Sequence, residues 1–281
     1  MKRHVFYFAL MFLVFSCQEK PEVDKRKLNF PKTRVQVQEM PQRDSLWLFV
    51  MAGQSNMAGR GFVEPQDTIS NKRILTINNS GQWVYAKEPL HFYEPKLTGL
   101  DCGLSFARTL LSEIPEGVSI GLIPCAVGGS SIEQWLGNET YRDVKLLSNL
   151  KERIAYAQKF GSIKGFLWHQ GESNAKPELI PEYGNRLKKL THTFRTIVKN
   201  DSLPIFMGQL GSYAAPLEKN KLWRSINSIV ENLSQTTNDI YVISTQDLVH
   251  KGDTVHFDSE SQRKMGRRFA KKYLDIAKST N

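Results

Sequence analysis

The chain has 281 residues, of which 40% are hydrophobic and 23% are charged, and its formal net charge is +10. This composition is typical of a globular protein with enough apolar residues for a core, and it excludes fibrous, repeat and intrinsically disordered classes. The length suits one large α/β domain or two small ones. The positive charge is not accompanied by a zinc-finger, RNP-like aromatic or helix-turn-helix pattern, so the sequence predicts no nucleic-acid partner.

The N-terminus has the pattern of a secretory signal peptide. A basic stretch over residues 1–4 precedes an apolar run over residues 5–15, which is shorter than the roughly 20 apolar residues that a membrane span needs. The run ends in a Val-Phe-Ser-Cys stretch at Cys17, which resembles the lipobox of bacterial lipoproteins. We therefore expect removal of residues 1–16, a lipid on Cys17, and an exported protein anchored to a membrane, either periplasmic or on the cell surface.

Residues 17–44 are polar, mixed in charge and interrupted by Pro21, Pro31 and Pro41. Such a segment can bury little apolar surface, and it is typical of a tether between an anchor and a domain. The alternation of Val35 and Val37 with polar residues could add a short edge strand.

Residues 45–281 alternate between short apolar segments and longer segments with helical periodicity, which predicts one α/β domain without internal repeats. The predicted strands are nearly continuous in β-branched and aromatic residues, as in a parallel sheet that is buried on both faces. They cover residues 46–51, 118–123, 163–168, 205–207 and 240–243, with a possible extra strand at 74–77. The predicted helices cover residues 103–111, 144–159, 182–198, 222–233 and 259–277. We therefore expect a three-layer α/β/α sandwich around a central parallel sheet, with sites at the carboxyl ends of the strands.

The cysteines and glycines give no indication of a metal or a nucleotide cofactor. Cys102 and Cys125 could form a disulfide in an oxidising compartment, or they could be two small buried residues. The sequence has no C-x-x-C spacing, no Cys/His ligand spacing and no G-x-G-x-x-G fingerprint. We expect neither a metal nor a cofactor.

Two small-residue turns follow predicted strands. A Gly-Gln-Ser-Asn turn after residues 46–51 could expose the hydroxyl of Ser55 beside its own backbone N–H, although such a turn is often only structural. After residues 118–123, Gly128 and Gly129 could let a backbone N–H approach a ligand, or they could simply form a tight loop.

Two further segments carry ionisable and amide side chains. A Trp-His-Gln-Gly-Glu-Ser stretch after the third of these strands contains Gln170, whose amide can donate to an oxyanion, and Glu172, whose carboxylate can orient a histidine. We interpret His169 in the same stretch as structural. Near the last helix, Asp253 stands three residues before His256, as expected for a general base and the acid that orients it.

In this order, the blocks resemble the sialate O-acetylesterase and acetylxylan esterase group of carbohydrate esterases, within the SGNH-hydrolase superfamily. The similarity runs from about residue 46 to 273 and includes the segments 48–61, 122–129, 168–173 and 253–256. The family pattern often has Asp where this chain has Asn174.

This resemblance implies a flavodoxin-like sheet and a set of residue roles. Ser55 would attack an acetyl carbonyl, and its N–H would share the oxyanion with Gly129 and the Gln170 side chain. His256 would be the base and then the acid. Its orienting carboxylate would be Asp253 by the superfamily's D-x-x-H block or Glu172 by the subfamily's preference, and we retain both.

The expected function is hydrolysis of acetyl esters on a glycan such as xylan or a sialic acid through an acetyl-serine intermediate. One alternative is a lipid or thioester hydrolase on the same scaffold, which would need an apolar acyl channel. Another is a glycan-binding lipoprotein that has lost catalysis.

Overall fold

A seven-stranded sheet runs through the centre of the computed structural model, which describes Met1 and residues 24–279. The strands lie in the order β3-β2-β4-β1-β7-β8-β9, and all neighbours are parallel except β2 and β3. Their bounds are β1 Leu46–Gly53, β2 Ile74–Ile77, β3 Trp83–Tyr85, β4 Ser119–Pro124, β7 Ser162–His169, β8 Ile205–Gly208 and β9 Ile240–Ile243. All six predicted strands are present, whereas the antiparallel edge strand β3 was not predicted. The sheet is therefore mostly, rather than wholly, parallel.

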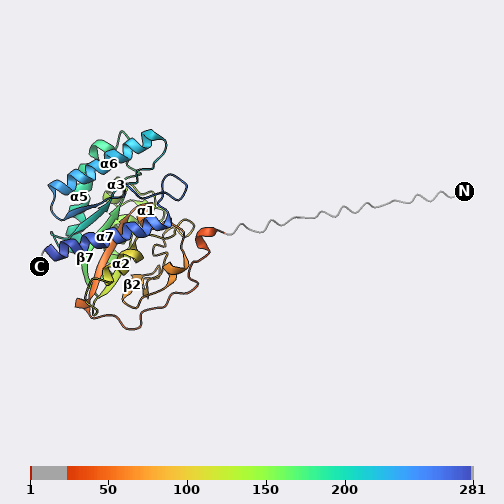
Figure 1. Ribbon diagram of the computed structural model, residues 1–281, viewed down its shortest axis with the longest axis vertical. Coiled ribbons are helices and arrows are strands. Elements are labelled where there is room, and N and C mark those ends of the chain that lie inside the picture. Colours follow the sequence, from red (N-terminus) through yellow and green to blue (C-terminus); the bar gives the residue numbers. More distant parts are fainter. Residues whose placement is uncertain (2–23, 280–281) are drawn as a thin grey trace.

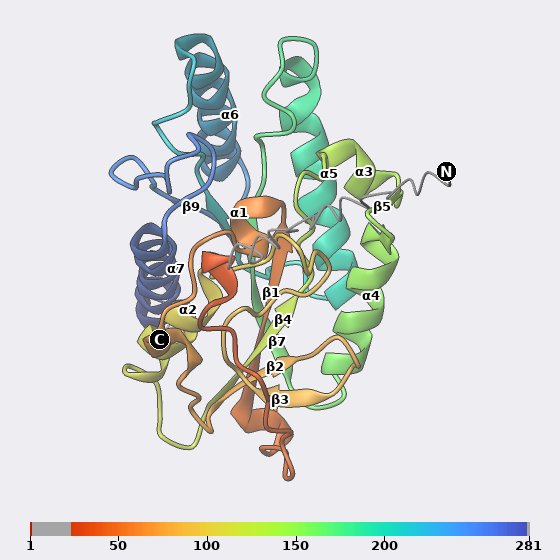
Figure 2. The ribbon, with the colours of Figure 1, turned by 90° about the vertical axis from the view of Figure 1, so that its right-hand side faces the viewer.

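Helices cover both faces of this sheet and complete the predicted three layers. In Figure 2, α2 and α7 lie on one side of β1 and β4, and α4 and α5 lie on the other. Figure 1 shows α6 next to α5, with which it packs. The helix bounds are α1 Ser55–Ala58, α2 Gly103–Leu111, α3 Ile132–Leu136, α4 Leu146–Ala157, α5 Ile180–Val198, α6 Leu217–Thr236 and α7 Ser259–Ser279. The five predicted helices are confirmed, and the short helices α1 and α3 were not predicted.

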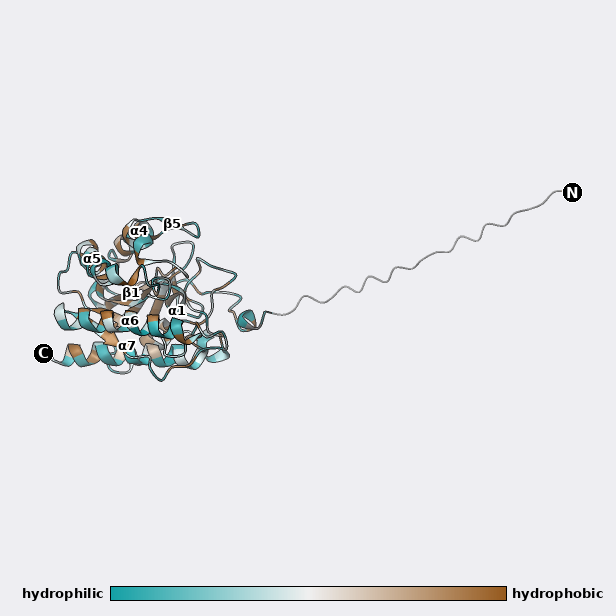
Figure 3. Ribbon diagram, turned by 90° about the horizontal axis from the view of Figure 1, so that it is seen from above, coloured by the Kyte–Doolittle hydropathy of each residue, from teal (hydrophilic) through white to brown (hydrophobic). Residues whose placement is uncertain are grey.

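Each face of the sheet has its own apolar core, because the long helices are amphipathic. Leu187 of α5 and Trp223 of α6 are buried in one core, and Phe106 of α2 and Phe269 of α7 are buried in the other. Figure 3 shows hydrophilic and hydrophobic residues alternating along α6 and α7. Full burial of one such large apolar side chain stabilises the fold by about 1.5–3 kcal/mol. The apolar face of each helix therefore holds that helix on the sheet.

The chain changes its direction of travel across the sheet at β1. It first builds β2 and β4 on one side of β1 and then crosses to β7, β8 and β9 on the other side. In open sheets of this type, ligands bind in the crevice outside the carboxyl ends of the strands at such a switch point. The ends of β1, β4 and β7 meet there, and each precedes one of the segments singled out in the sequence.

The described part of the predicted tether is attached to the domain. The Arg26 side chain donates to the Lys96 carbonyl at 2.7 Å, and Gln36 forms an isolated antiparallel bridge with Val84 of β3. Two 3-10 helices, Lys25–Lys27 and Arg43–Ser45, interrupt this segment. Within residues 24–44, the predicted tether therefore contacts the domain through both side chains and backbone. The predicted signal peptide and Cys17 lie outside the described residues.

Cys102 and Cys125 are both buried and free, so the possible disulfide between them is not formed. Across residues 24–279, no helix is long and apolar enough to cross a membrane.

Candidate active site

Ser55 lies at the carboxyl end of the central strand β1, at the start of α1. Gly53 directly precedes this turn with φ +131°, and a Cβ there would lie 2.1 Å from the His169 carbonyl oxygen on β7. Only glycine allows β1 and β7 to approach so closely at this point. Gln54 then turns the chain, since its carbonyl accepts the N–H groups of Met57 and Ala58. The Ser55 N–H has no hydrogen-bond partner among the described residues.

His256 reaches Ser55 from the loop between β9 and α7. Its Nε2 lies 3.0 Å from Ser55 Oγ, and its Nδ1 lies 2.7 Å from Asp253 Oδ2. The other Asp253 oxygen accepts the backbone N–H groups of Val255 at 3.0 Å and His256 at 2.8 Å. This turn holds the carboxylate against the imidazole before any substrate is bound. The structure thus brings Ser55 together with His256 and Asp253, which lie about 200 residues further along the chain.

The charges of this trio suit a general base. Burial lowers the pKa of His256 from its usual value of 6.5, although Asp253 opposes the shift. Burial would raise the pKa of Asp253, but the hydrogen bonds from His256 and Val255 outweigh it and bring this pKa to about 2. At neutral pH, Asp253 is therefore ionised, and His256 is mostly neutral and able to accept a proton.

Glu172 lies in the same region but contacts a different residue. Its Oε1 accepts a 2.7 Å hydrogen bond from Asn56 Nδ2 and lies 3.8 Å from His169 Nδ1. No hydrogen bond joins Glu172 to His256 among residues 24–279. His169 is fully buried, and its Nε2 bonds the carbonyl of Gln209 at 2.9 Å, a structural position.

The paired glycines lie beside the end of β1. The N–H of Val127 donates to the Gly53 carbonyl at 3.2 Å, which fixes the loop after β4 next to the serine turn. Gly129 has φ +82°, and its N–H has no partner in the described part of the chain. The free N–H groups of Gly129 and Ser55 are therefore both available to a ligand at this strand end.

Gln170 is held in a buried network instead of being free. Its Nε2 donates to Asn174 Oδ1 at 2.7 Å and to Gln54 Oε1 at 3.2 Å, while its Oε1 accepts from the Tyr183 hydroxyl at 3.1 Å. The side chain is buried, so both of its amide protons have partners inside the protein. Asn174, where the family pattern often has Asp, in turn donates to Glu133 at 2.8 Å.

A buried ion-pair cluster supports the glycine loop, and sequence reasoning did not find it. Glu94 Oε2 accepts hydrogen bonds from Arg60 at 2.7 Å and from the Gly128 N–H at 2.6 Å, and its Oε1 pairs with Arg142. Burial alone would raise the pKa of Glu94, but Arg60 and its hydrogen bond lower it, so the carboxylate stays charged. The residues of this cluster are far apart in the chain, so no local sequence pattern indicates that they meet. Arg142 sits in a short hairpin formed by β5 (Thr140–Tyr141) and β6 (Val144–Lys145).

Asn56 is a second residue whose role was missed. It belongs to the serine turn noted in the sequence, but nothing local shows that it links two loops. Its Nδ2 donates to Glu172 and to the Val255 carbonyl at 3.2 Å, and its Oδ1 accepts the Phe257 N–H at 3.0 Å.

The described residues contain no group of three or more metal-ligating side chains.

Comparison with known proteins shows which family the chain is similar to. Residues 45–275 match a family model described as carbohydrate esterase, sialic acid-specific acetylesterase. A probable carbohydrate esterase of Arabidopsis thaliana is 29% identical over 246 residues, which cover 81% of this chain and 90% of that protein. The crystal structure of an Arabidopsis thaliana protein is similar with a TM-score of 0.70 and 28% identity, covering 82% of this chain and 98% of that one.

Two more distant structures share the fold. NanS has a TM-score of 0.67 and 19% identity, covering 85% of this chain and 100% of its own. XAC1771, a carbohydrate acetylesterase from Xanthomonas citri, has a TM-score of 0.58 and 22% identity, covering 80% of this chain and 55% of its own. The chain belongs to the carbohydrate esterase, sialic acid-specific acetylesterase family, and it is a carbohydrate acetylesterase of the serine-hydrolase type with an SGNH-like fold.

Proposed function

We propose that the protein removes acetyl groups from a glycan through an acetyl-serine intermediate formed at Ser55. The observation that carries this proposal is the relay in which Ser55 Oγ lies 3.0 Å from His256 Nε2, and His256 Nδ1 lies 2.7 Å from Asp253. Membership of a carbohydrate esterase family supports acetylated sugars, such as acetylated xylan or sialic acids, as the substrate class. It favours this function over a lipid or thioester hydrolase and over a glycan-binding protein without activity.

In the acylation step, neutral His256 keeps its Nδ1 proton in the hydrogen bond to ionised Asp253, accepts the Ser55 hydroxyl proton at Nε2 and so becomes an imidazolium that the Asp253 carboxylate stabilises. The serine oxygen forms a bond to the acetyl carbonyl carbon, and the carbonyl oxygen becomes an oxyanion. His256 then gives its proton to the sugar oxygen as the C–O bond breaks, which releases the deacetylated sugar and leaves acetyl-serine. Water activated by His256 attacks this ester in the same way and releases acetate.

The oxyanion would be stabilised by the backbone N–H groups of Ser55 and Gly129. Both lack partners among the described residues, and both flank the crevice at the end of β1. Donors that are already oriented stabilise developing charge without reorganisation, and removing one such donor typically costs about 10²–10³-fold in turnover. We assign Gln170 to the support of these loops instead, because its amide protons already have internal acceptors.

The same geometry supports Asp253 as the carboxylate that orients His256. Its two oxygens accept three hydrogen bonds from the segment that carries the histidine. Glu172 would act indirectly, by holding Asn56, which forms hydrogen bonds with the residues on either side of His256.

Acetate release from a panel of acetylated xylan, acetylated pectin and O-acetylated sialosides tests the function. Ser55→Ala should lower turnover by about 10⁴-fold or more, because triad members act as a unit. Ser225→Ala, which removes an exposed hydroxyl from α6, is the matched control and should keep full activity. Binding of an acetylated glycan without acetate release by the unaltered protein would contradict the proposal.

We also propose that the protein is exported and held at a membrane by a lipid on Cys17. The basic start, the short apolar run and the cysteine at its end support this. Expressed with its N-terminus in a bacterium, the protein should fractionate with membranes, and Cys17→Ser should release it. Recovery of the unaltered protein in the soluble fraction with an unmodified Cys17 would contradict the anchor.

A further inference from the structure

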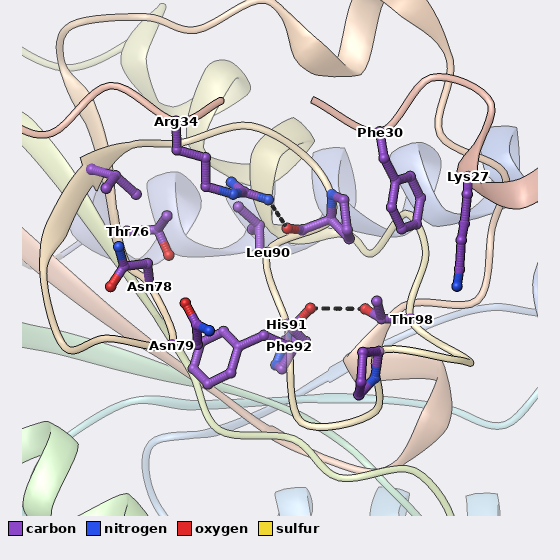
Figure 4. Close-up of a pocket in the computed structure, with 13 residues that line it drawn as sticks. Lys27, Phe30, Arg34, Thr76, Asn78, Asn79, Leu90, His91, Phe92 and Thr98 are labelled. Carbon is purple, nitrogen blue, oxygen red and sulfur yellow. Dashed lines mark hydrogen bonds between the residues drawn. The ribbon is translucent and has the colours of Figure 1, made fainter. Parts of the chain in front are cut away.

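A cavity of about 410 Å³ lies away from Ser55, between the N-terminal segment and the loop that follows β3 (Figure 4). Lys27, Phe30 and Arg34 line it from the N-terminal segment, and residues 89–98 contribute much of the remaining wall. Asn78 and Asn79, from the turn between β2 and β3, line a further part. Its volume falls in the range of small-molecule sites, which is about 300–1,000 Å³.

The charge of this cavity is positive. Lys27 and Arg34 line it, and none of its lining residues is acidic. Among the described residues, the Arg34 guanidinium donates only to neutral backbone carbonyls, those of Lys87 at 2.7 Å and Pro89 at 2.5 Å. The nearby Glu88 offers little compensation, because burial and the carboxylates of Asp101 and Asp67 raise its pKa well above the usual value. An anionic group in the cavity would therefore meet two cations without a competing carboxylate.

Rings and a free amide complete the lining. Figure 4 shows Phe30 and Phe92 on opposite sides of the cavity, with Asn79 beside Phe92. The Asn79 side chain has no hydrogen-bond partner among residues 24–279 and is exposed. Aromatic faces contact the C–H faces of a sugar ring, and an amide can donate to and accept from its hydroxyl groups. A cation pair, two rings and an amide are the groups that recognise a sugar bearing a carboxylate.

The cavity is connected to the catalytic centre through one loop. Residues 89–98 line it on one side, and Glu94 of the same loop binds Arg60 and the Gly128 N–H next to the proposed oxyanion donor. A second cavity, of about 710 Å³, shares Asn79 and Phe92 with the first and is lined by Arg142, the other partner of Glu94. The two cavities thus share part of their walls, and the second one reaches the hairpin that carries Arg142.

We propose that the cavity between Lys27, Arg34 and Phe92 is a non-catalytic subsite for a carboxylate-bearing sugar residue of the glycan, remote from the residue whose acetyl group is removed. This inference rests on the proposed function for the identity of the ligand as a glycan. It does not rest on the chemistry at Ser55, so binding can be tested apart from catalysis.

The test is calorimetric titration of the otherwise complete chain carrying Ser55→Ala, with two acidic oligosaccharides and their neutral counterparts. Trigalacturonate is compared with galactotriose, and sialyllactose is compared with lactose. At least one acidic sugar should bind about tenfold more tightly than its neutral counterpart, a difference that corresponds to one or two charge-assisted contacts. Equal or undetectable binding of both members of both pairs would overturn the proposal.

Three variants then locate the bound sugar. Lys27→Gln, Asn79→Ala and Phe92→Ala should each weaken binding by about threefold to tenfold. Lys32→Gln removes the same charge from an exposed position of the same segment that does not line the cavity, and it should leave binding unchanged. Unchanged binding in both Lys27→Gln and Asn79→Ala, whose altered side chains are exposed, would overturn the assignment even if Phe92→Ala does not fold.

Hydrolysis of p-nitrophenyl acetate separates this proposal from the proposed function. With Ser55 intact, Lys27→Gln should hydrolyse this small ester at the rate of the unaltered protein, because the ester does not reach the cavity. Loss of that activity in Lys27→Gln would contradict a separate subsite. An unaltered protein that binds acidic sugars but releases no acetate from any ester would instead refute the proposed function and leave the subsite supported.

Discussion

Glu172 Oε1 accepts a 2.7 Å hydrogen bond from Asn56 Nδ2, and Asn56 in turn bonds the backbone on both sides of His256. This relationship explains how Glu172 can affect His256 without contacting it. Asp253 holds the imidazole itself, whereas Glu172 holds the residue that positions the histidine loop. The two carboxylates therefore have separable effects on activity.

Asp253→Asn and Glu172→Gln should differ strongly. Asp253→Asn removes the charge beside His256 Nδ1 and should lower turnover by about 10⁴-fold, as expected when a triad histidine loses its orienting acid. Glu172→Gln keeps an oxygen that can accept from Asn56 and loses only charge assistance, so it should cost about tenfold or less. Steady-state hydrolysis of p-nitrophenyl acetate measures both, and the reverse ranking would make Glu172 the triad acid.

Asn56→Ala should damage stability and activity together. It removes the hydrogen-bond partner of the Phe257 N–H and of Glu172 Oε1 and one of the two donors to the Val255 carbonyl, so the free energy of unfolding should fall by about 2–4 kcal/mol. Urea unfolding and kcat measure the two effects. Asn232→Ala, on the exposed side of α6, should change stability by no more than about 0.5 kcal/mol. Asn56→Ala with unchanged stability and unchanged kcat would remove Asn56 from the positioning role.

The pH dependence of activity should follow the protonation of His256. Protonated His256 cannot accept the Ser55 proton, so kcat/KM should fall as pH drops through the pKa of this residue. Because burial lowers that pKa from 6.5, the midpoint of the acid limb should lie below pH 6.5. Asp253 titrates only near its pKa of about 2 and should not contribute to this limb. A pH profile with its midpoint above 7 would contradict the assignment of His256 as the base.

Gln170→Ala distinguishes a supporting residue from an oxyanion donor. If Gln170 supports the loops, the variant removes the side-chain hydrogen bonds to Asn174 Oδ1 and from the Tyr183 hydroxyl, although each keeps one backbone partner, and the free energy of unfolding should fall by about 1–3 kcal/mol. Thermal unfolding and kcat should be measured on the same preparation. Full stability combined with a loss of about 10²–10³-fold in kcat would restore Gln170 to the oxyanion hole.

Most of the sheet and the long helices could be predicted because their periodicity is local. The strand at residues 240–243 and the helix at residues 103–111 have the predicted bounds, since β-branched runs and amphipathic stripes define them. The edge strand β3 spans only Trp83–Tyr85, which is too short to show a period. The hairpin at Arg142 was missed because its two turn residues, Arg142 and Asp143, adopt positive φ without the usual Asn-Gly signal.

The site was predictable in its parts but not in its pairings. Ser55, Asp253 and His256 follow from local motifs. The choice between Asp253 and Glu172 depends on which loop faces the imidazole, and spacing along the chain does not encode that. The same holds for Glu94, which meets Arg60 across 34 residues, and for Gln170, whose acceptors include Gln54 and Ser130 from two other loops.

The most direct test of the central claim is to trap the acetyl group on the enzyme. Rapid acid quench during turnover of p-nitrophenyl acetate, followed by peptide mass spectrometry, should find acetyl on the peptide that contains Ser55, together with a burst of nitrophenol. The acetylated fraction should disappear in Ser55→Ala. An acetyl group on another residue, or undiminished hydrolysis by Ser55→Ala, would contradict Ser55 as the nucleophile that His256 activates.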